Sequence, residues 1–456
     1  MAAILVSSPR PCPDRLDGVV VRMEWHAALP FTYRDFVDDA LFHPRYGYYA
    51  TGAVRFGEGG HYDTFPTALS PLVGRMVAGA ARRVWIRAGR PPRFEVCELG
   101  AGNGQLCLDT VATVRTRAGR AAWRAFARAF RYRVIERSPA LIARQRAKLG
   151  PLAADVVWTR ADLSRRALAR PLGGAGFVIA NEVLDCLAHH KIVAGRDGRS
   201  RVVFVQARRP NGRVLSRRAL AERLARGARV RYREVARPLD RVPGLARFLA
   251  TYCPERLRTA TPCPPYFACP EMPRLVRATA RLYGRAEVVW IDYGAHRSFH
   301  LRTPESRRVF AGPPRSGRTV YDAPGRDDVT FMVDFTVVAT TARAAGLRIT
   351  WDGGQVGLAI AGGVRVGARE IALVARTRAL WWLLEALSPG RDQAWRRRGL
   401  TWSRGAARGG ALLAGIRRDV EEFLGRRPSR FRLLAMSSGP SAFSRAAARR
   451  GRRTDC

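Results

Sequence analysis

Residues 94–104 read Phe-Glu-Val-Cys-Glu-Leu-Gly-Ala-Gly-Asn-Gly, an apolar run that leads into a glycine-rich turn. The run predicts a short buried strand with Glu98 near its end, and the residues that follow predict a helix. Glycine lets the backbone turn sharply and lets a ligand approach the amides that open the next helix. The stretch therefore favours an α/β fold, in which the turn either binds a nucleotide-like ligand or simply joins a strand to a helix.

The spacing of the three glycines bears on which ligand the turn would bind. Gly100, Gly102 and Gly104 form a G-x-G-x-G pattern, whereas a dinucleotide fingerprint requires its third glycine where this chain has Gln105. The next strand-end carboxylate, Glu136, also lies well beyond the roughly 20 residues that separate loop and acid in NAD-binding folds. The pattern therefore disfavours NAD and raises S-adenosylmethionine as the alternative.

Further strands and helices alternate along the chain. A long helical pattern follows the glycine turn, and Ser138-Pro139 is typical of a helix start, with a capping serine and proline at the first helical position. Apolar runs predict strands at 94–99, 132–136, 156–158, 177–181, 288–291 and 347–351, with a further helix over 335–346. This alternation predicts a parallel sheet that is covered by helices on both faces.

The chain is strongly basic, with a formal net charge of +43. Of its 80 basic side chains only Lys148 and Lys191 are lysine, and the arginines run through the whole sequence rather than forming one stripe. We interpret this as a generally basic surface produced by a compositional bias, with a dedicated nucleic-acid face as the alternative. No specific nucleic acid is expected as a partner, although polyanions should bind non-specifically at low salt.

Cysteine usage and hydropathy limit the class of protein further. The eight cysteines include no C-x-x-C pair, and the seven histidines form no Cys/His array, so we expect reduced thiols and no metal. No apolar run approaches the roughly 20 residues that span a bilayer, and the N-terminus lacks the pattern of a signal peptide. The sequence therefore predicts a cytoplasmic protein without a membrane partner.

Polar side chains follow the ends of the predicted strands. Because ligands bind beyond the carboxyl ends of strands in an open α/β sheet, these side chains are candidate site residues. Any one of them alone also fits a helix cap, but several in register around one glycine turn favour a shared site. They are Glu98, Glu136, Asp162, Asn181, Glu182, Asp185 and Asp292.

Several blocks together carry a family resemblance. They are His43–Tyr49 (HPRYGYY), Glu98–Gly104 (ELGAGNG), Glu136–Gln145 (E-x-S-P-x-L-x-x-x-Q), Ala180–Asp185 (ANEVLD), Asp292–Gly294 (DYG), Pro324–Phe335 (PGRDDVTFMVDF) and the late Gln355. In this order the blocks resemble the MidA family of S-adenosylmethionine-dependent methyltransferases, which includes the mitochondrial complex I assembly-factor arginine methyltransferase. The resemblance implies a Rossmann-like class I methyltransferase sheet with helices on both faces, an N-terminal cap and an inserted α+β subdomain.

Two blocks depart from the family pattern. The family's G-D-F-x-T-x-P block is one residue out of step at Gly60–Pro66, and its Ala-Leu-Pro continuation after the A-N-E-x-x-D block is replaced here by Cys186-Leu187-Ala188. The Arg-rich tail has no counterpart in the family. These departures bear on the identity of the substrate more than on the binding of the cofactor.

The sequence divides into six expected regions. A long excursion marks the insertion, and it contains a predicted hairpin, Lys191–Val193 and Arg201–Val205 around a Gly-Arg-Asp-Gly turn. The regions are a flexible N-terminal extension (1–22), an N-terminal cap region (23–93), a cofactor-binding core (94–189), an inserted substrate-side subdomain (190–285), the rest of the core (286–375) and a basic, partly disordered C-terminal region (376–456) in which residues 416–424 are amphipathic.

The resemblance suggests a role for each cofactor-side residue. Glu98 would support the glycine turn and reach the methionine amino group, and Gly100, Gly102 and Gly104 would allow close approach of the backbone. Glu136 would bind the ribose hydroxyls, and Asp162 the amino edge of adenine. Tyr48 and Tyr49 would cap the pocket, unless they only pack in the core.

The acceptor side is expected at Asn181, Glu182 and Asp185. A carboxylate pair three residues apart can bind a planar guanidinium in a bidentate manner, which suits arginine; the alternative is that Asn181 and Asp185 cap a helix. By resemblance, the expected reaction is N-methylation of a protein arginine, with a protein as the partner. A cofactor-binding assembly factor with little turnover stays open as a second hypothesis.

A nucleic-acid methyltransferase is the third hypothesis. Enzymes that methylate base amino groups typically carry an Asn/Asp-Pro-Pro-aromatic block after the fourth strand, where it stacks a flipped base. Here that position reads Asn181-Glu182-Val183-Leu184, without proline or an aromatic residue. The sequence therefore disfavours this hypothesis despite the high positive charge.

Overall fold

The computed structural model describes residues 6–7, 23–24, 30–52, 54, 56, 64–257, 264–297, 309–312, 317–387, 405–427, 429, 431–439 and 441–443. The expected extension 1–22 lies outside the described residues except for β1 (Val6–Ser7), which pairs in parallel with β2 (Met23–Glu24). Most of the out-of-step block at 60–66 and the last Arg-rich residues of the chain lie outside them too.

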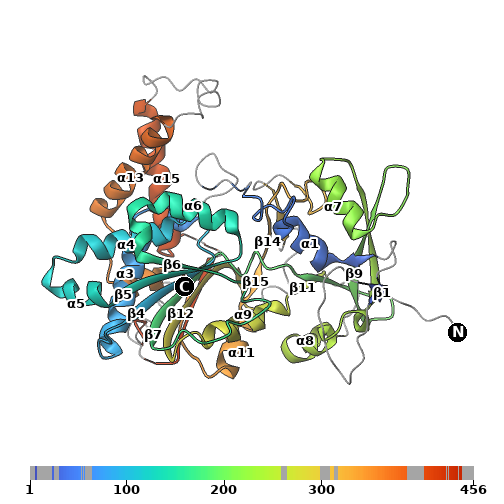
Figure 1. The fold of residues 1–456 in the computed structure, drawn as a ribbon, viewed down its shortest axis with the longest axis horizontal. Helices are drawn as coiled ribbons and strands as arrows, with labels where there is room; N and C mark the ends of the chain where they lie inside the picture. The colour runs from blue at the N-terminus through green and yellow to red at the C-terminus, as the bar shows by residue number, and fades with distance from the viewer. Residues whose placement is uncertain are drawn as a thin grey trace.

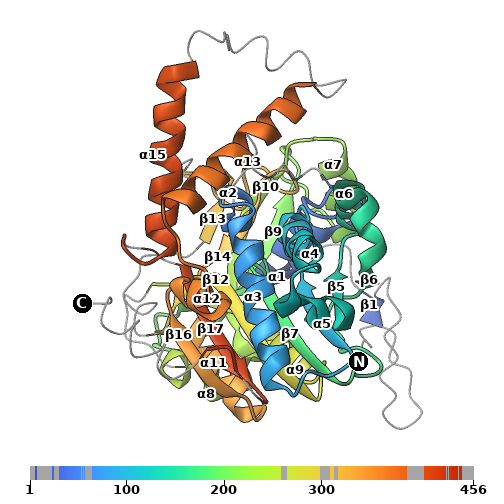
Figure 2. The same ribbon diagram turned by 90° about the vertical axis from the view of Figure 1, so that its left-hand side faces the viewer.

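A twisted central sheet forms the body of the protein (Figures 1 and 2). Its strands follow the order β16-β17-β12-β7-β4-β5-β6, and the short β15 (Val333–Asp334) pairs with the end of β12. The bounds are β4 (Phe94–Leu99), β5 (Phe130–Glu136), β6 (Val156–Arg160), β7 (Ala175–Asn181), β12 (Arg285–Ala295), β16 (Arg348–Gly353) and β17 (Phe431–Ser437).

The strand directions determine where the site lies. Strands β12, β7, β4, β5 and β6 are parallel to one another, whereas β17 runs antiparallel between β12 and β16. From β4 the chain builds outward through β5 and β6, then returns to the other side of β4 to form β7. A reversal of this kind opens a crevice at the carboxyl ends of β4 and β7. The predicted class of fold, an α/β class I methyltransferase sheet, is confirmed.

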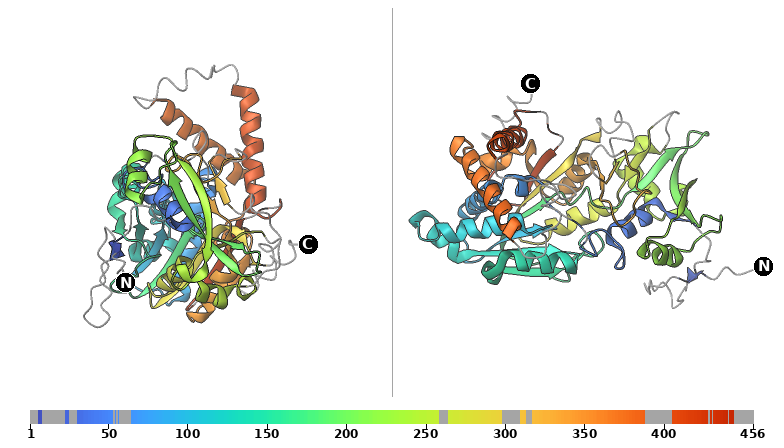
Figure 3. Two further views of the ribbon diagram at one scale, coloured as in Figure 1. Left: turned by 90° about the vertical axis from the view of Figure 1, so that its right-hand side faces the viewer. Right: turned by 90° about the horizontal axis from the view of Figure 1, so that it is seen from above.

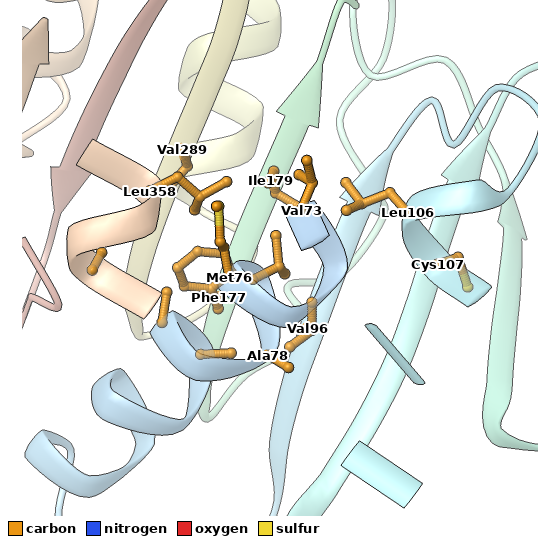
Figure 4. Packing of buried hydrophobic residues seen from close by; sticks show 14 of the residues in the cluster. Val73, Met76, Ala78, Val96, Leu106, Cys107, Phe177, Ile179, Val289 and Leu358 are labelled. Atoms are coloured by element: carbon orange, nitrogen blue, oxygen red, sulfur yellow. The ribbon is translucent and has the colours of Figure 1, made fainter. Parts of the chain in front are cut away.

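Alternate residues of the strands pack into two separate cores. On one face Val96, Phe177 and Ile179 contact helices α3 (Leu72–Arg87), α4 (Gln105–Arg117) and α12 (Val356–Gly362). Figure 4 shows Met76 and Val73 of α3 over this face, with Leu358 of α12 beside them. On the opposite face α8 (Leu245–Tyr252), α9 (Glu271–Ala280) and α11 (Phe335–Ala344) cover Cys97, Val178 and Trp290. Burial on both faces explains why the strands read as continuous apolar runs.

The predicted helical stretch after the glycine turn is two helices. Helix α4 ends at Arg117 and α5 (Ala121–Ala129) follows it, after which Phe130 already begins β5. The predicted helix start at Ser138 is confirmed: its hydroxyl accepts a hydrogen bond from the backbone N–H of Leu141, and α6 (Pro139–Leu149) and the 3₁₀ turn η1 (Gly150–Asp155) lead to β6.

A second, antiparallel sheet lies beside the central one (Figures 1 and 3). Its order is β10-β9-β8-β11, and the predicted hairpin is its β8–β9 pair. The bounds are β8 (His190–Ala194), β9 (Ser200–Arg208), β10 (Arg231–Pro238) and β11 (Tyr266–Ala268), with α7 (Arg217–Ala225) after β9. The N-terminal region joins this sheet, because β3 (Phe31–Thr32) pairs with β9 and α1 (Tyr33–Phe42) packs against it. A two-stranded pair, β13 (Val309–Ala311) and β14 (Val329–Phe331), and the short α2 (Phe65–Ala68) complete the surroundings of the site.

The C-terminal region differs from what the sequence suggested. Helices α13 (Ala368–Leu387) and α15 (Gly405–Phe423) project from the body (Figure 2), and the base of α15 is anchored by the buried Ile416, Val420 and Phe423. The sequence analysis missed β17, which it assigned to a basic, partly disordered region. A run of only seven residues between arginine-rich segments resembles tail sequence locally, and only pairing with β12 and β16 makes it a core strand. No helix in the described ranges is both long and apolar enough to cross a bilayer.

Candidate active site

A cavity of about 170 Å³ lies at the carboxyl ends of β4, β5, β6 and β7. Most of the residues that the sequence predicted for the site line it: Tyr49, Glu98, Gly100, Gly102, Glu136, Asp162, Asn181 and Glu182. The other four, Tyr48, Gly104, Asp185 and Asp292, do not reach its wall. The strand-end acids are thus brought together around the glycine turn, as expected from the sheet topology.

The glycine turn has the backbone conformation that the sequence predicted. Gly100, Gly102 and Gly104 have φ values of +62°, +51° and +78°, a region that L side chains rarely adopt. A Cβ at Gly102 would lie 3.3 Å from the ring of Phe56, and one at Gly104 would lie 3.2 Å from Gln145. Gly104 therefore serves to start α4 and to pack against α6, while Gly100 and Gly102 line the cavity.

Glu98 lies at the end of β4 and is almost completely buried. The hydroxyl of Tyr132 donates a hydrogen bond to Oε2 of Glu98 at 2.7 Å. Burial raises the pKa of Glu98 to about 8, although the bond from Tyr132 favours the carboxylate. A cationic group that entered the cavity beside Glu98 would therefore favour its ionisation.

Glu136 is held by groups from the helix that follows it. Its Oε1 accepts a hydrogen bond from the backbone N–H of Ser138 at 2.9 Å, and its Oε2 accepts one from Gln145 at 3.3 Å. The same amide of Gln145 donates to the carbonyl of Gly102, and Trp158 donates to the oxygen of Gln145. Burial raises the pKa of Glu136 above its ordinary value. Gln145, noted in the sequence only as part of a motif, thus joins the glycine turn to the acid.

The two tyrosines of the HPRYGYY block have different environments. Tyr48 is fully buried and makes an edge contact with Tyr49, so the structure places it in the core, the alternative that the sequence left open. Tyr49 lines the cavity, and its hydroxyl donates to Oδ1 of Asp328 at 2.9 Å and lies 3.2 Å from Sγ of Cys186. Asp328 and Cys186 were not among the predicted site residues.

Glu182 has an unusual backbone at the end of β7. Its φ is +54°, although glutamate has no special tolerance for the left-handed region, and its N–H donates to the carbonyl of Ile291 at 2.8 Å. The side-chain amide of Asn181 donates to Oε1 of Glu182 at 2.8 Å. Strain of this kind persists only where the surroundings enforce it, and it concentrates at functional sites.

Asp185 lies behind the wall of the cavity rather than on it. It is 5% exposed, and its Oδ1 is buried without a hydrogen-bond partner among the residues that the structure describes. Burial, together with the nearby Asp292, Glu182 and Asp328, raises the pKa of Asp185 well above its ordinary value. The structure thus brings together four acids from three parts of the chain, two more than the predicted carboxylate pair.

The acids beside Asp185 are also protonated more readily than usual. Burial raises the pKa of Asp292 to about 7, despite four backbone N–H groups that favour its carboxylate, and raises the pKa of Asp328 to about 6. Within the described parts of the chain, no three His, Cys, Asp or Glu side chains are grouped so that they could hold a metal ion. With Glu182 on the wall of the cavity and the other three acids behind it, this end is suited to a cationic organic group.

The residues present fit S-adenosylmethionine. The glycines allow close approach of its main-chain-like end, Glu98 offers a buried carboxyl to an ammonium group, and Glu136 lies where a ribose would follow. Asp162, expected at the adenine edge, also lines the cavity, but its oxygens contact Ser164, Arg137 and Arg165. The sequence did not single out these arginines, although Arg137 directly follows Glu136 at the end of β5.

Comparisons with solved structures agree with this fold. The chain is 20% identical to a protein from Burkholderia thailandensis whose crystal structure contains S-adenosyl-homocysteine, with a TM-score of 0.62 over 92% of this chain and 91% of that one. A second, native crystal structure from the same organism gives a TM-score of 0.59, with 20% identity and the same coverage of both chains. At this level of identity the likeness shows the fold.

Sequence comparisons identify the family as well as the fold. The chain is 32% identical over 80 residues to protein arginine methyltransferase NDUFAF7, mitochondrial, of Mus musculus, and the match spans 18% of this chain and 18% of that relative. A family model described as S-adenosyl-L-methionine-dependent methyltransferase matches residues 76–352, more than half of the chain and nearly all of the central sheet. The cofactor of this family is the one that the glycine turn and the strand-end acids indicated. The chain belongs to the family of S-adenosyl-L-methionine-dependent methyltransferases.

Proposed function

We propose that this protein transfers a methyl group from S-adenosylmethionine to a side-chain nitrogen of arginine in a protein substrate. The observation that carries the proposal is Glu182, a glutamate held with a φ of +54° at the wall of the cavity, next to the cofactor-side glycines. Its neighbour Asn181 orients the carboxylate through the 2.8 Å hydrogen bond to Oε1. The name of the relative from Mus musculus, a protein arginine methyltransferase, supports the same acceptor.

The acids behind Glu182 favour a cationic acceptor. Burial raises the pKa of Asp185, Asp292 and Asp328 above the ordinary value, and for Asp185 repulsion from Asp292, Glu182 and Asp328 raises it further. A guanidinium entering beside Glu182 would offset this repulsion and be held in a fixed plane by the carboxylate. An uncharged acceptor would gain nothing from the arrangement.

The chemistry needs positioning more than acid catalysis. S-adenosylmethionine supplies an electrophilic methyl group on a sulfonium. The acceptor nitrogen forms the new N–C bond as the C–S bond breaks, the bonding electron pair stays on sulfur, and one proton leaves the nitrogen. Glu182 would align the guanidinium for in-line attack, localise its charge and take up the proton. Asn181 would keep the carboxylate in place, and the buried wall formed by Tyr49 and Cys186 would exclude water.

A methylation assay tests the acceptor. The purified protein would be incubated with S-adenosylmethionine and a size-fractionated extract of its own cells, with formation of S-adenosylhomocysteine and methylated arginine followed by mass spectrometry. We expect methylarginine in one or a few proteins, and its loss in the Glu182→Gln variant. The matched control is Glu421→Gln. Glu421 lies on α15 outside the cavity, and its carboxylate pairs with Arg427.

Other outcomes would point elsewhere. A protein that binds S-adenosylhomocysteine but forms none in the presence of any fraction would act as an assembly factor with little turnover. Methyl groups recovered on nucleotides instead of arginine would replace the protein acceptor with a nucleic acid. We also propose a cytoplasmic location, which a fluorescent fusion would test; the relative from Mus musculus is mitochondrial.

A further inference from the structure

Four charged side chains form a closed ring at the end of the cavity lined by Asp162. Asp38 of α1 contacts Arg137 through Oδ1 at 3.2 Å and Arg165 through Oδ2. The Nε atoms of the same two arginines each lie 3.3 Å from Oδ2 of Asp162. Each acid thus contacts both arginines, and the ring carries no net charge. It joins the N-terminal helix to the loops that follow β5 and β6.

The two carboxylate oxygens of Asp162 have different partners. Its Oδ1 accepts hydrogen bonds from the backbone N–H and the hydroxyl of Ser164, and its Oδ2 contacts both arginines. The contacts to the arginines are ion pairs, and among the residues that the structure describes Oδ2 accepts no hydrogen bond, so it can still accept one from a ligand. Asp162 therefore holds the arginines in place, and its contact with the adenine amino group stays a prediction.

Arg137 presents the surface that the ring holds in place. It lines the cavity directly after Glu136, and its guanidinium carbon lies 3.9 Å from the centre of the Phe42 ring. Phe42 therefore covers one face of the guanidinium, while Asp38 and Asp162 hold its edge. A planar guanidinium fixed in this way offers its remaining face to a flat aromatic ligand.

The segment that carries Asp38 is attached to the cofactor-binding core at further points. The hydroxyl of Ser138 donates to the carbonyl of Tyr49 at 2.8 Å, and Arg144 donates to the carbonyl of Val54 at 2.7 Å. Asp38 itself is 8% exposed, and although burial favours its neutral form, Arg137, Arg165 and Arg34 lower its pKa below the ordinary value. Asp38 thus stays charged over the whole range in which the protein would work.

We propose that Asp38 is a positioning residue for the adenine end of the cofactor site, because it holds Arg137 and Arg165 against Asp162 and so fixes the guanidinium of Arg137 as the wall on which the adenine ring packs. The N-terminal helix thereby becomes part of the cofactor site without contacting the reacting atoms. The inference depends on the cofactor and not on the acceptor, so its test is independent of the proposed arginine methylation.

Calorimetry with two ligands tests this proposal. S-adenosylhomocysteine contains the adenine ring, and S-ribosylhomocysteine lacks it while keeping the ribose and the amino acid. We expect Asp38→Asn to weaken the binding of S-adenosylhomocysteine by about fivefold to thirtyfold, the range of a lost cation–π contact, with little change for S-ribosylhomocysteine. The control is Asp39→Asn on the same helix, whose carboxylate pairs with Arg217 outside the cavity.

A second variant protects the test against a failure to fold. Arg137→Lys keeps a positive charge between the two acids but has no planar face, so it should show the same ligand-selective loss with a thermal midpoint close to that of the parent protein. Asp38→Glu should recover part of the affinity. Equal losses for both ligands would mean a purely structural role, and unchanged affinity for S-adenosylhomocysteine in either main variant would overturn the proposal.

Discussion

Oδ2 of Asp292 accepts a hydrogen bond from the backbone N–H of Leu184 at 2.8 Å, although the two residues are 108 positions apart. The same oxygen lies 3.1 Å and 3.4 Å from the backbone nitrogens of Val183 and Asp185, and Oδ1 accepts from the N–H of Tyr293 at 2.8 Å. One carboxylate at the end of β12 therefore holds the whole turn that follows Glu182. This contact explains how the strained backbone of Glu182 is maintained.

Replacing Asp292 with alanine should disrupt the acceptor side more than the cofactor side. Four backbone amides would lose their acceptor, three of them in the turn after Glu182, so we expect a loss of about 2–4 kcal/mol of stability and a fall in methyl transfer of at least tenfold. Asp292→Asn keeps an acceptor oxygen and should be milder in both respects. Thermal unfolding and the rate of S-adenosylhomocysteine formation measure the two effects. An alanine variant with parental turnover would show that the turn needs no such anchor.

Binding of the cofactor should release a proton at neutral pH. The pKa of Glu98 is raised to about 8 by burial, so the group is mostly protonated before binding at pH 7, and an ammonium beside it would drive its ionisation. Affinity should therefore rise between about pH 6 and 8. Calorimetry in buffers with different ionisation enthalpies counts the released protons. Glu98→Gln should bind more weakly and release none, and a parental protein without proton release would exclude this role for Glu98.

Removing the carboxylate of Glu136 should weaken cofactor binding directly. Both of its oxygens are oriented by Ser138 and Gln145, so little reorganisation precedes binding of a ribose. We expect Glu136→Ala to lower the affinity for S-adenosylhomocysteine by at least tenfold in calorimetry, the cost of losing charge-assisted hydrogen bonds of about 1.5–3 kcal/mol. Asp155→Asn, which removes a partner of Arg115 outside the cavity, is the control. Unchanged affinity in the alanine variant would remove Glu136 from the site.

The glycine turn offers a matched pair of substitutions. Gly102 has a φ of +51° and would bring a Cβ to 3.3 Å from Phe56, whereas a Cβ at Gly119 would meet nothing within 4 Å. Gly102→Ala should therefore cost about 1–2 kcal/mol in stability and weaken cofactor binding, while Gly119→Ala should be nearly neutral. Denaturant unfolding and calorimetry would report both quantities. Equal effects of the two changes would contradict the conformational requirement.

The buried acids should make stability depend on pH. The folded protein binds protons at Asp292 and Asp328 more tightly than the unfolded chain, because their pKa values are raised to about 7 and about 6 from 3.8. Their stabilising contribution is complete below about pH 4 and is lost as the pH rises through 6 and 7. Asp328→Asn should flatten this decline by on the order of 2 kcal/mol, which denaturant titrations between about pH 4 and 7 would detect. A decline of the same steepness in the variant would show that Asp328 does not titrate in this range.

The conformation of the glycine turn and the positions of the strand ends could be predicted from the sequence, because their signals are local. Positive φ values at Gly100 and Gly102 follow from residue type, and the strand-end position of Glu136 follows from a short apolar run. Gln145, which orients Glu136, appeared in the sequence only as one position of a motif. Its role could not be predicted, because its three hydrogen bonds join residues from different elements. Contacts of this kind need the fold before they can be recognised.

The acceptor side was less predictable for the same physical reason. Asp185 was expected to form a carboxylate pair with Glu182 at the site. Instead, Asp292 holds the turn that follows Glu182, and the carboxylate of Asp185 lies behind the cavity wall. The ring around Asp38 was missed because α1 reaches the cofactor end of the cavity only through tertiary packing. Strand β17 was missed because its seven residues carry no turn or repeat signal that separates them from the arginine-rich segments beside them.

The position of β17 has a consequence for how the protein is made. Its residues 431–437 follow β12 and β16 in the chain, yet they occupy the interior of the sheet between these two strands. During synthesis, the edges of β12 and β16 that face β17 must therefore stay unpaired until β17 has emerged. Exposed strand edges pair readily with other chains, so nascent or prematurely terminated copies should be the forms most dependent on chaperones.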